Sequence, residues 1–248
     1  MKGFRILLLF LALISTPLGA VSPIPATGEP TSPESVLFVG NSFTFYNNAI
    51  PTHLRQLLLN GAPRSESIWF LRTMAMSGAA LAEHRGGLEQ VLGSRPLDVV
   101  VLQGHSREAF EPDMQAAFET AASVFSEMIR EAGAEPVLFM TWAYSGRPEM
   151  TPVLDQAFST VGRELGVRVI PVGLAFQRAL DTITGLSLHA GDGLHPSLEG
   201  TYLAAAVFYA ALWQLSPEGL VYDAGIDPDI ARQLRRVAWQ TVQTYQAR

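Results

Sequence analysis

The stretch LDVVVLQ, Leu97 to Gln103, indicates the fold of this protein more clearly than any other segment. Its apolar residues form a short continuous run without polar alternation, which is typical of a strand that is buried on both faces. The segment Met114 to Gly133 has the apolar spacing of a helix and ends in a glycine, a common residue at helix C-termini. A buried strand followed by such a helix is the building unit of a parallel sheet covered by helices.

The same alternation of strand-like and helix-like segments extends along most of the chain. The other predicted strands are SVLFVG (Ser35 to Gly40), SIWFLRTMAM, EPVLFMTWAY and VRVIPVG. The other predicted helices are AIPTHLRQLLLNG, ALAEHRGGLEQVL, Pro152 to Leu165, LEGTYLAAAVFYAALWQL and a last one near Ile230 to Tyr245. We therefore expect an α/β fold in which helices cover both faces of a mainly parallel sheet, within a single domain over residues 35–248.

The composition of the chain argues against several classes of protein. The 248 residues are 48% hydrophobic and 16% charged, a balance that suits a sizeable buried core. The net charge is −6 and no basic stripe is visible, so we expect no nucleic-acid partner. The chain has no cysteine, which excludes disulfides, cysteine-based catalysis and most zinc-site designs.

The first 20 residues, MKGFRILLLFLALISTPLGA, have the pattern of a signal peptide. Lys2 and Arg5 form a positive start, and an apolar run over residues 6–14 follows them. Residues 21–34 form a polar, proline-rich linker, which disfavours the alternative of a retained membrane anchor. We therefore expect a secreted or periplasmic protein with no stable membrane span after signal cleavage.

Polar residues follow several predicted strands at their carboxyl ends, where ligands of parallel α/β sheets bind. The first strand leads into VGNSFT, the second into MSG and the third into LQGHS. The turn GDGLHPS, residues 191–197, comes after the last strand. Five residues from these segments are expected to meet at one edge of the sheet: Ser42, Gly78, Gln103, Asp192 and His195.

Three of these residues can form a nucleophilic relay. A serine hydroxyl is a weak nucleophile until a base takes its proton, and His195 is the candidate base for Ser42. Asp192 lies three residues before His195, so its carboxylate can fold back to fix the imidazole tautomer and stabilise the imidazolium. Gly193 permits unusual backbone angles in this turn, and Pro196 restricts the residue before it to an extended conformation.

The same reaction needs hydrogen-bond donors for the negative charge that develops on the carbonyl oxygen. The backbone amides of Ser42 and Gly78 and the side-chain amide of Gln103 are the candidates. Gly78 could instead be a simple strand-exit glycine, and Gln103 could instead hydrogen-bond a neighbouring loop. The two functions stay open for both residues at this point.

Four short blocks, FVGNSFT, MSG, VVLQGHS and DGLHPS, occur in this order along the chain. They resemble the blocks of the SGNH, or GDSL-type, hydrolase superfamily, and the resemblance extends roughly from Ser35 to Trp213. It implies a three-layer α/β/α sandwich with a flavodoxin-like sheet. It also implies ester hydrolysis by a Ser-His-Asp triad, here Ser42, His195 and Asp192, without a cofactor.

Two blocks depart from the usual pattern of the superfamily. The first, usually G-D-S, reads G-N-S at residues 40–42, as in an uncharacterised bacterial branch. The third, usually G-x-N-D with asparagine as oxyanion donor, reads LQGHS. Its Q-G pair is similar to a Q-G-E stretch in branches that act on acetylated sugars. We therefore expect Gln103 to be the third donor, with His105 and Ser106 as alternatives.

These features predict a secreted serine esterase that removes acetyl or short acyl groups from a carbohydrate or a similar ester. We expect Asn41, His105, Trp142 and Tyr144 to contact the substrate, although the last two could equally be core aromatics under a loop. A non-catalytic carbohydrate or cell-envelope binding protein is the alternative from another class, and a lipase-like or acyltransferase activity is the nearer one. A flavin or nucleotide binder is disfavoured, because no Gly-rich phosphate loop follows the first strand.

The remaining histidines do not indicate a metal site. His53, His84 and His189 have no metal-ligand spacing with carboxylates, and we expect them to be solvated helix or loop residues. The sequence therefore predicts no metal and no other cofactor.

Overall fold

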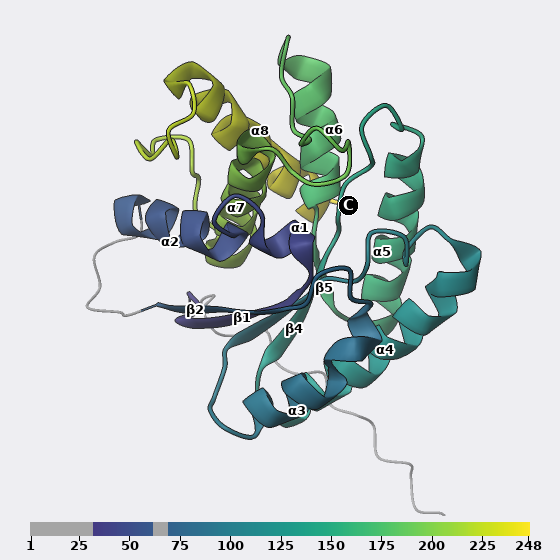
Figure 1. Ribbon diagram of the computed structural model, residues 1–248. Coiled ribbons are helices and arrows are strands. Elements are labelled where there is room, and N and C mark those ends of the chain that lie inside the picture. The colour runs from purple at the N-terminus through teal and green to yellow at the C-terminus, as the bar shows by residue number, and fades with distance from the viewer. Residues whose placement is uncertain (1–31, 62–68) are drawn as a thin grey trace, which may run out of the picture. The chain divides into compact units, whose positions relative to one another are not determined.

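A five-stranded, all-parallel sheet forms the centre of the computed structural model (Figure 1). The strands are β1 (Ser35–Gly40), β2 (Phe70–Ala75), β3 (Val99–Leu102), β4 (Glu135–Phe139) and β5 (Arg168–Ile170). Their order in the sheet is β2-β1-β3-β4-β5, which is the order of doubly wound, flavodoxin-like folds. This topology confirms the predicted α/β class and the parallel sheet.

The structure describes residues 32–61 and 69–248. The predicted signal peptide, residues 1–20, lies outside the described residues, and so does most of the predicted linker at 21–34. From Ser32 onward the chain forms one compact unit.

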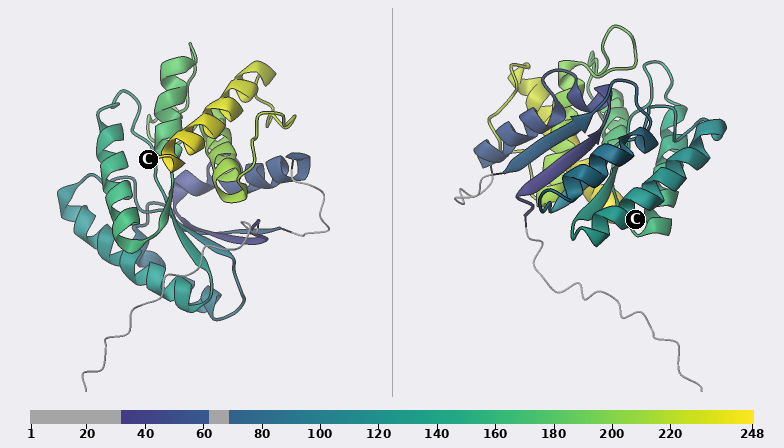
Figure 2. Two further views of the ribbon diagram at one scale, coloured as in Figure 1. Left: turned by 180° about the vertical axis from the view of Figure 1, so that it is seen from behind. Right: turned by 60° about the horizontal axis from the view of Figure 1, so that its bottom comes forward.

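Helices cover both faces of the sheet (Figures 1 and 2). On one face lie α2, α6, α7 and α8, and on the other lie α3, α4, α5 and the short 3-10 helix η1. The bounds are α1 (Ser42–Phe45), α2 (Ile50–Gly61), η1 (Leu81–His84), α3 (Arg85–Leu92), α4 (Pro112–Glu131), α5 (Met150–Leu165), α6 (Val172–Thr182), α7 (Leu198–Trp213) and α8 (Pro228–Gln246). The three layers form the α/β/α sandwich that the resemblance implied.

Alternate residues of each strand enter the two cores of the sandwich. In β1, Val36 and Phe38 pack under α7, whereas Leu37 and Val39 pack toward the opposite helices. This is the two-residue periodicity of a strand that is covered on both faces, and it explains why the strands are continuously apolar.

Helix α7 is apolar around its whole circumference, and its residues from Gly200 to Trp213 are all buried. A helix of this kind is found in the interior of a domain. No helix within residues 32–61 and 69–248 has the combination of length and apolar character that crossing a membrane requires. Because α7 begins directly after the turn at residues 191–197, it anchors that turn to the core.

The sequence pattern did not predict two of the described helices, the one-turn helix α1 and helix α6. The segment VRVIPVG predicts a strand through Gly173, but β5 ends at Ile170 and α6 begins at Val172. Gly173 allows this early start, because a Cβ atom there would lie 2.1 Å from the backbone oxygen of Thr141. Gly173 therefore permits the start of α6 to lie against the backbone that follows β4.

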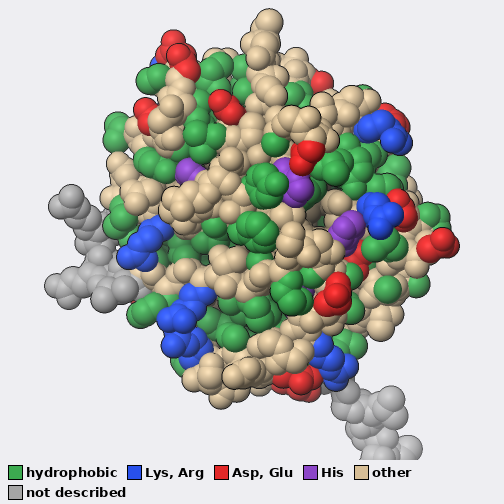
Figure 3. Space-filling view, viewed as in Figure 1, with side chains coloured by type: hydrophobic (Ala, Val, Ile, Leu, Met, Phe, Trp, Pro, Cys, Tyr) green, Lys and Arg blue, Asp and Glu red, His purple; other side chains and the backbone are tan. Residues whose placement is uncertain are grey.

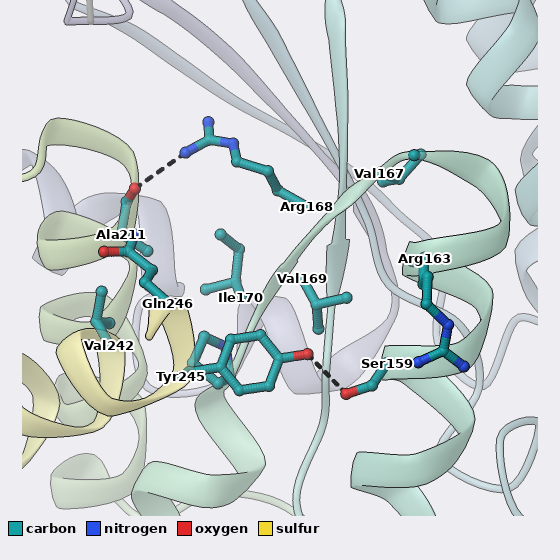
Figure 4. Close-up of a pocket in the computed structure, with 13 residues that line it drawn as sticks. Ser159, Arg163, Val167, Arg168, Val169, Ile170, Ala211, Val242, Tyr245 and Gln246 are labelled. Atoms are coloured by element: carbon teal, nitrogen blue, oxygen red, sulfur yellow. Dashed lines mark hydrogen bonds between the residues drawn. The ribbon is translucent and has the colours of Figure 1, made fainter. Parts of the chain in front are cut away.

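A cavity of about 400 Å³ lies at the open edge of the sheet, along β5 and between α5 and α8 (Figure 4). In this β5-edge cavity, the hydroxyl groups of Ser159 and Tyr245 are hydrogen-bonded at 2.8 Å. Arg168 crosses the edge and donates to the backbone oxygen of Ala211 at 3.2 Å. No histidine or carboxylate is among the described residues that line this cavity.

Candidate active site

Ser42 lies at the carboxyl end of β1, where the chain turns from strand to helix. Asn41 is the N-cap of the one-turn helix α1, and its side-chain oxygen accepts a hydrogen bond from the Phe43 amide at 3.2 Å. Ser42 is the first helical residue, so its own amide is one of the N-terminal groups without an intrahelical acceptor. Its hydroxyl is therefore presented at the carboxyl edge of the sheet.

The turn that carries His195 is closed by its own backbone. His189 and Pro196 pair across an isolated antiparallel bridge, and the Ala190 amide donates to the oxygen of His195 at 2.7 Å. Gly193 has a φ of +72°, which glycine adopts without steric cost. Gly193 thus adopts the unusual backbone angle that the sequence predicts for this turn.

The structure brings Ser42, His195 and Asp192 together in one hydrogen-bonded line. His195 Nε2 lies 2.8 Å from Ser42 Oγ, and His195 Nδ1 lies 2.5 Å from Asp192 Oδ2. Because the ionised carboxylate is only an acceptor, Nδ1 carries the ring proton and Nε2 accepts from the serine hydroxyl. A base that contacts the hydroxyl is the arrangement that activates a serine nucleophile.

The carboxylate of Asp192 is held in its ionised form. Its hydrogen bond from His195, and then the backbone amides of Leu194 and His195 that donate to Oδ1, lower the pKa of Asp192 to about 2. The carboxylate is consequently available at neutral pH to orient the imidazole and to stabilise its protonated form.

Each of the four consecutive carbonyl groups from Gly193 to Pro196 accepts a hydrogen bond. The donors, in order, are Ser145 N, Trp142 Nε1, Ala190 N and Asn47 Nδ2, at 2.9, 3.1, 2.7 and 2.8 Å. These donors come from four separate positions in the chain, so the histidine turn is fixed from several sides. Rigid support of this kind keeps a reactive side chain in one rotamer.

A cavity of about 350 Å³, called here the triad cavity, opens in front of Ser42 and His195. Gly78 lines it with a φ of +69°, and no atom lies within 4 Å of where its Cβ would stand. Neither the Ser42 amide nor the Gly78 amide donates to an acceptor among residues 32–61 and 69–248. Two free backbone donors beside a serine hydroxyl are suited to bind an oxyanion.

Gln103 does not reach the triad cavity, contrary to its predicted role as third donor. Its side chain is fully buried, and its oxygen accepts from the Asn41 amide and the Thr44 hydroxyl at 3.0 and 2.9 Å. Its nitrogen donates to Asn41 Oδ1 and to the oxygen of Gly104 at 2.8 and 2.6 Å. Both amide hydrogens are therefore used inside the protein, and Gln103 links β1 to β3 instead.

Asn41 lines the triad cavity, although its side chain is bonded inside the protein, whereas Trp142 is not among the described residues that line this cavity. The side-chain nitrogen of Asn41 donates to the backbone oxygens of Ala79 and Gly104 at 3.1 and 3.3 Å. Trp142 is 1% exposed and stacks between Phe43 and Phe176, with ring centroids 4.5 and 4.3 Å away. Trp142 is thus a core aromatic, the alternative that the sequence left open.

Three of the other predicted residues do line the triad cavity. They are His105, Ser106 and Tyr144, and the hydroxyl groups of the last two are hydrogen-bonded at 2.9 Å. His105 Nδ1 accepts a hydrogen bond from the Arg107 amide at 3.2 Å. Because a backbone amide can only donate, the proton of the neutral imidazole is on Nε2, which makes Nε2 a donor. Burial, together with the charge of Arg107, lowers the pKa of His105 and favours this neutral form.

Glu108 is a buried carboxyl group that the sequence pattern did not single out. It is 1% exposed, and its Oε2 accepts from the amides of His105 and Leu81 at 2.5 and 3.1 Å. Burial raises the pKa of Glu108. Its contacts hold the loop after β3 against η1, and so they fix the wall of the cavity that His105 forms.

Tyr46 and Asn47, which no sequence pattern indicated, also contact the histidine turn. The Tyr46 ring stacks on the His195 imidazole, and Asn47 donates to the oxygen of Pro196. Two other histidines, His53 and His84, are buried, although the sequence predicts them to be solvated. Their side chains are 5% and 2% exposed. Figure 3 shows histidine side chains near the middle of the face viewed in Figure 1, with charged side chains of both signs scattered around them.

Comparison with solved structures places this fold among known ones, although no family model and no curated protein matches the chain. A candidate SGNH hydrolase from Slackia heliotrinireducens shares 29% identity and a TM-score of 0.57, over 70% of this chain and 96% of that one. A DUF4886 family protein from Bacteroides uniformis shares 20% identity and a TM-score of 0.66, over 84% of this chain and 94% of that one. An acetylxylan esterase from Geobacillus stearothermophilus, Axe2, shares 18% identity and a TM-score of 0.56, over 74% and 95%.

These similarities confirm that the chain has an SGNH-hydrolase-like fold. At this level of identity the neighbours define the fold, whereas the chemistry must be argued from the side chains of this chain.

Proposed function

We propose that this protein is a serine ester hydrolase in which Ser42 is the nucleophile, His195 the general base and Asp192 the residue that orients His195. The single observation that carries the proposal is the continuous hydrogen-bonded line from Asp192 through His195 to Ser42 Oγ, which ends in an open cavity. The SGNH-hydrolase-like fold supports the same class of reaction.

In the proposed mechanism, Ser42 Oγ attacks the ester carbonyl while its proton moves to His195 Nε2. The carbonyl oxygen becomes negative and is stabilised by the amides of Ser42 and Gly78. Collapse of the tetrahedral intermediate breaks the bond to the alcohol oxygen, which takes the proton from His195. Water then attacks the acyl-serine, and His195 accepts and returns a proton in the same way.

The triad cavity suits a small acyl group on a polar alcohol. Its volume of about 350 Å³ is near the lower end of the range for ligand pockets, which favours a short acyl chain. Around it stand the hydroxyl groups of Ser106 and Tyr144 and the Nε2–H of His105, which can bond the hydroxyl groups of a sugar. We therefore propose acetyl or other short-acyl esters of carbohydrates as the substrate class, with secretion as the proposed location because of the signal-like residues 1–20.

A direct test compares two serines that both line cavities. Purified protein is assayed with p-nitrophenyl acetate, butyrate and octanoate, and with acetylated xylo-oligosaccharides. We expect turnover of the short esters, a loss of at least about 10³-fold in kcat for Ser42→Ala, and full activity for Ser159→Ala in the β5-edge cavity. Full activity in Ser42→Ala would refute the proposal, and glycan binding without any turnover would favour the non-catalytic alternative.

A further inference from the structure

Residues Tyr46–Ala49, called here the left-handed turn, connect α1 to α2 through an unusual backbone. Asn47, Asn48 and Ala49 have φ values of 49°, 70° and 70°. Side chains with a Cβ rarely adopt positive φ, and three such residues in succession without a glycine make a costly turn. Strain of this kind persists where surrounding contacts hold it, and it is concentrated at functional sites.

The first contact of the left-handed turn is with the histidine ring itself. The rings of Tyr46 and His195 are stacked, with centroids 4.0 Å apart and planes inclined by 8°. The Tyr46 amide donates to the oxygen of Ser42 at 3.1 Å. The residue that covers one face of the imidazole is therefore tied directly to the residue whose hydroxyl the imidazole contacts.

The second contact is with the backbone next to the histidine. Asn47 Nδ2 donates to the oxygen of Pro196 and to Thr201 Oγ1, both at 2.8 Å. Thr201 is fully buried in α7, so the Asn47 side chain is held between the histidine turn and the core. This contact joins segments that are about 150 residues apart in the sequence, at a separation of 149 between Asn47 and Pro196.

His53 holds the backbone of the left-handed turn through a hydrogen bond to the oxygen of Asn47. Its Nε2 lies 2.8 Å from the oxygen of Asn47, and its Nδ1 lies 2.8 Å from the hydroxyl of Tyr222. Because a carbonyl oxygen can only accept, Nε2 carries the proton and Nδ1 accepts from the tyrosine hydroxyl. The buried His53 therefore opposes relaxation of the strained backbone.

We propose that the left-handed turn is a positioning device for His195, in which Tyr46 fixes the plane of the imidazole and Asn47 fixes the Pro196 carbonyl beside it. The inference rests on the proposed function and adds two positioning residues to it. The imidazole must face Ser42 with one nitrogen and Asp192 with the other, and a displacement of about 1 Å lowers the rate of such a reaction about 100-fold. Stacking on one face and an anchor at the next residue oppose both tilt and translation.

Two neighbouring asparagines provide a matched test. Asn47 and Asn48 both have positive φ, so a glycine relieves the backbone at either position. The side chain of Asn48 is exposed and makes no hydrogen bond within the part of the chain that the structure describes. We expect Asn47→Gly to lower kcat about tenfold or more with KM changed less than twofold, and Asn48→Gly to stay within twofold of wild type.

The stacked ring is tested by a second pair of variants. Tyr46→Leu removes the aromatic face, and we expect a three- to tenfold lower kcat at unchanged KM. Tyr46→Phe keeps the ring, so it should restore kcat. If the turn had a merely structural role, Tyr46→Leu and Asn47→Gly would both lower the unfolding midpoint, and neither would lower kcat selectively while KM stays unchanged.

Nuclear magnetic resonance gives a readout that does not depend on turnover. The ring current of Tyr46 should displace the carbon-bound ring protons of His195, which are assigned by their loss in His195→Ala. We expect these protons to move toward ordinary shifts in Tyr46→Leu, to change in Asn47→Gly, and to stay in place in Tyr46→Phe and Asn48→Gly. Unchanged His195 shifts in Tyr46→Leu and Asn47→Gly overturn the positioning role, whether or not the wild-type protein hydrolyses esters.

Discussion

The triad cavity and the β5-edge cavity both present a serine hydroxyl that is hydrogen-bonded to a ring side chain. In the first, Ser42 contacts the imidazole of His195, and in the second, Ser159 contacts the phenol of Tyr245 (Figure 4). The volumes are similar, about 350 and about 400 Å³. Cavity size therefore does not distinguish the two sites.

The difference lies in what each partner can do with the serine proton. Burial raises the pKa of Tyr245, so its hydroxyl stays protonated and cannot act as a base for Ser159. Ser159 Oγ donates to Asp155 Oδ1 at 3.1 Å, but that carboxylate is paired with Arg248, which contacts both of its oxygens at 2.8 Å. The imidazole of His195 has an unshared pair on Nε2, and the ionised Asp192 stands behind its other nitrogen. A serine in a cavity is thus a candidate nucleophile only where a base, backed by a fixed acceptor, contacts it.

The largest expected effect comes from removing the ring side chain that contacts each serine, His195 for Ser42 and Tyr245 for Ser159. We expect His195→Ala to lower kcat by about 10⁴-fold or more, because no other described group contacts Ser42 Oγ as a base. Tyr245→Phe should leave kcat within twofold of wild type. Steady-state kinetics on p-nitrophenyl acetate measures both, and similar losses in the two variants would contradict the distinction between the cavities.

A second prediction concerns the buried amide network behind Ser42. Gln103→Leu leaves the Asn41 amide and the Thr44 hydroxyl without their buried acceptor, so we expect the free energy of unfolding to fall by about 3 kcal/mol. The control is Gln90→Leu at an exposed helix position, which should change it by less than about 0.5 kcal/mol. Urea denaturation measures both. A large loss of kcat in Gln103→Leu at unchanged stability would instead restore Gln103 as an oxyanion donor.

A third prediction concerns the support of the histidine turn by the core. Trp142→Phe keeps an aromatic ring between Phe43 and Phe176 but loses the donor to the oxygen of Leu194. We expect the free energy of unfolding to fall by about 1 kcal/mol, with a loss in kcat of less than about tenfold. The control is Trp239→Phe, since the Trp239 indole donates no hydrogen bond within the described residues. An equal effect of the two changes on kcat would show that the Leu194 contact does not support the site.

The smallest expected effect is the contribution of Asp192 to stability. Its pKa falls from 3.8 to about 2 on folding, chiefly through the hydrogen bond from His195, so folding favours the ionised form. The contribution is therefore present above about pH 4 and is lost as the pH falls through about 2. We expect the difference in unfolding free energy between wild type and Asp192→Asn to shrink over this range. A difference that stays constant from pH 6 to pH 2 would contradict it.

The fold was largely predictable from the sequence because burial on both faces leaves a direct pattern. The continuous apolar runs from Val36 to Val39 and from Val99 to Leu102 are strands for this reason. Helix α6 was missed because the apolar run VRVIPVG does not show by itself that β5 ends at Ile170 and that Gly173 packs against the backbone of Thr141.

The candidate site was predictable in position and only partly in detail. The order of the strands brings Ser42 and His195 to one edge, and the spacing of Asp192 and His195 brings their side chains together. The position of a residue in the sequence does not determine which way its side chain points at the end of a strand. Gln103 was therefore expected in the cavity, although its side chain lies in the core. The contact of Asn47 with Pro196 has no local signal, because it spans 149 residues.

Labelling with a fluorophosphonate, followed by mass spectrometry of the peptides, tests most directly whether Ser42 is an activated nucleophile. The account predicts near-complete modification of Ser42 in the wild-type protein, little or none in folded His195→Ala, and none at Ser159. Modification of Ser159 or of another serine in place of Ser42, or the absence of any modification in folded wild-type protein, would contradict it.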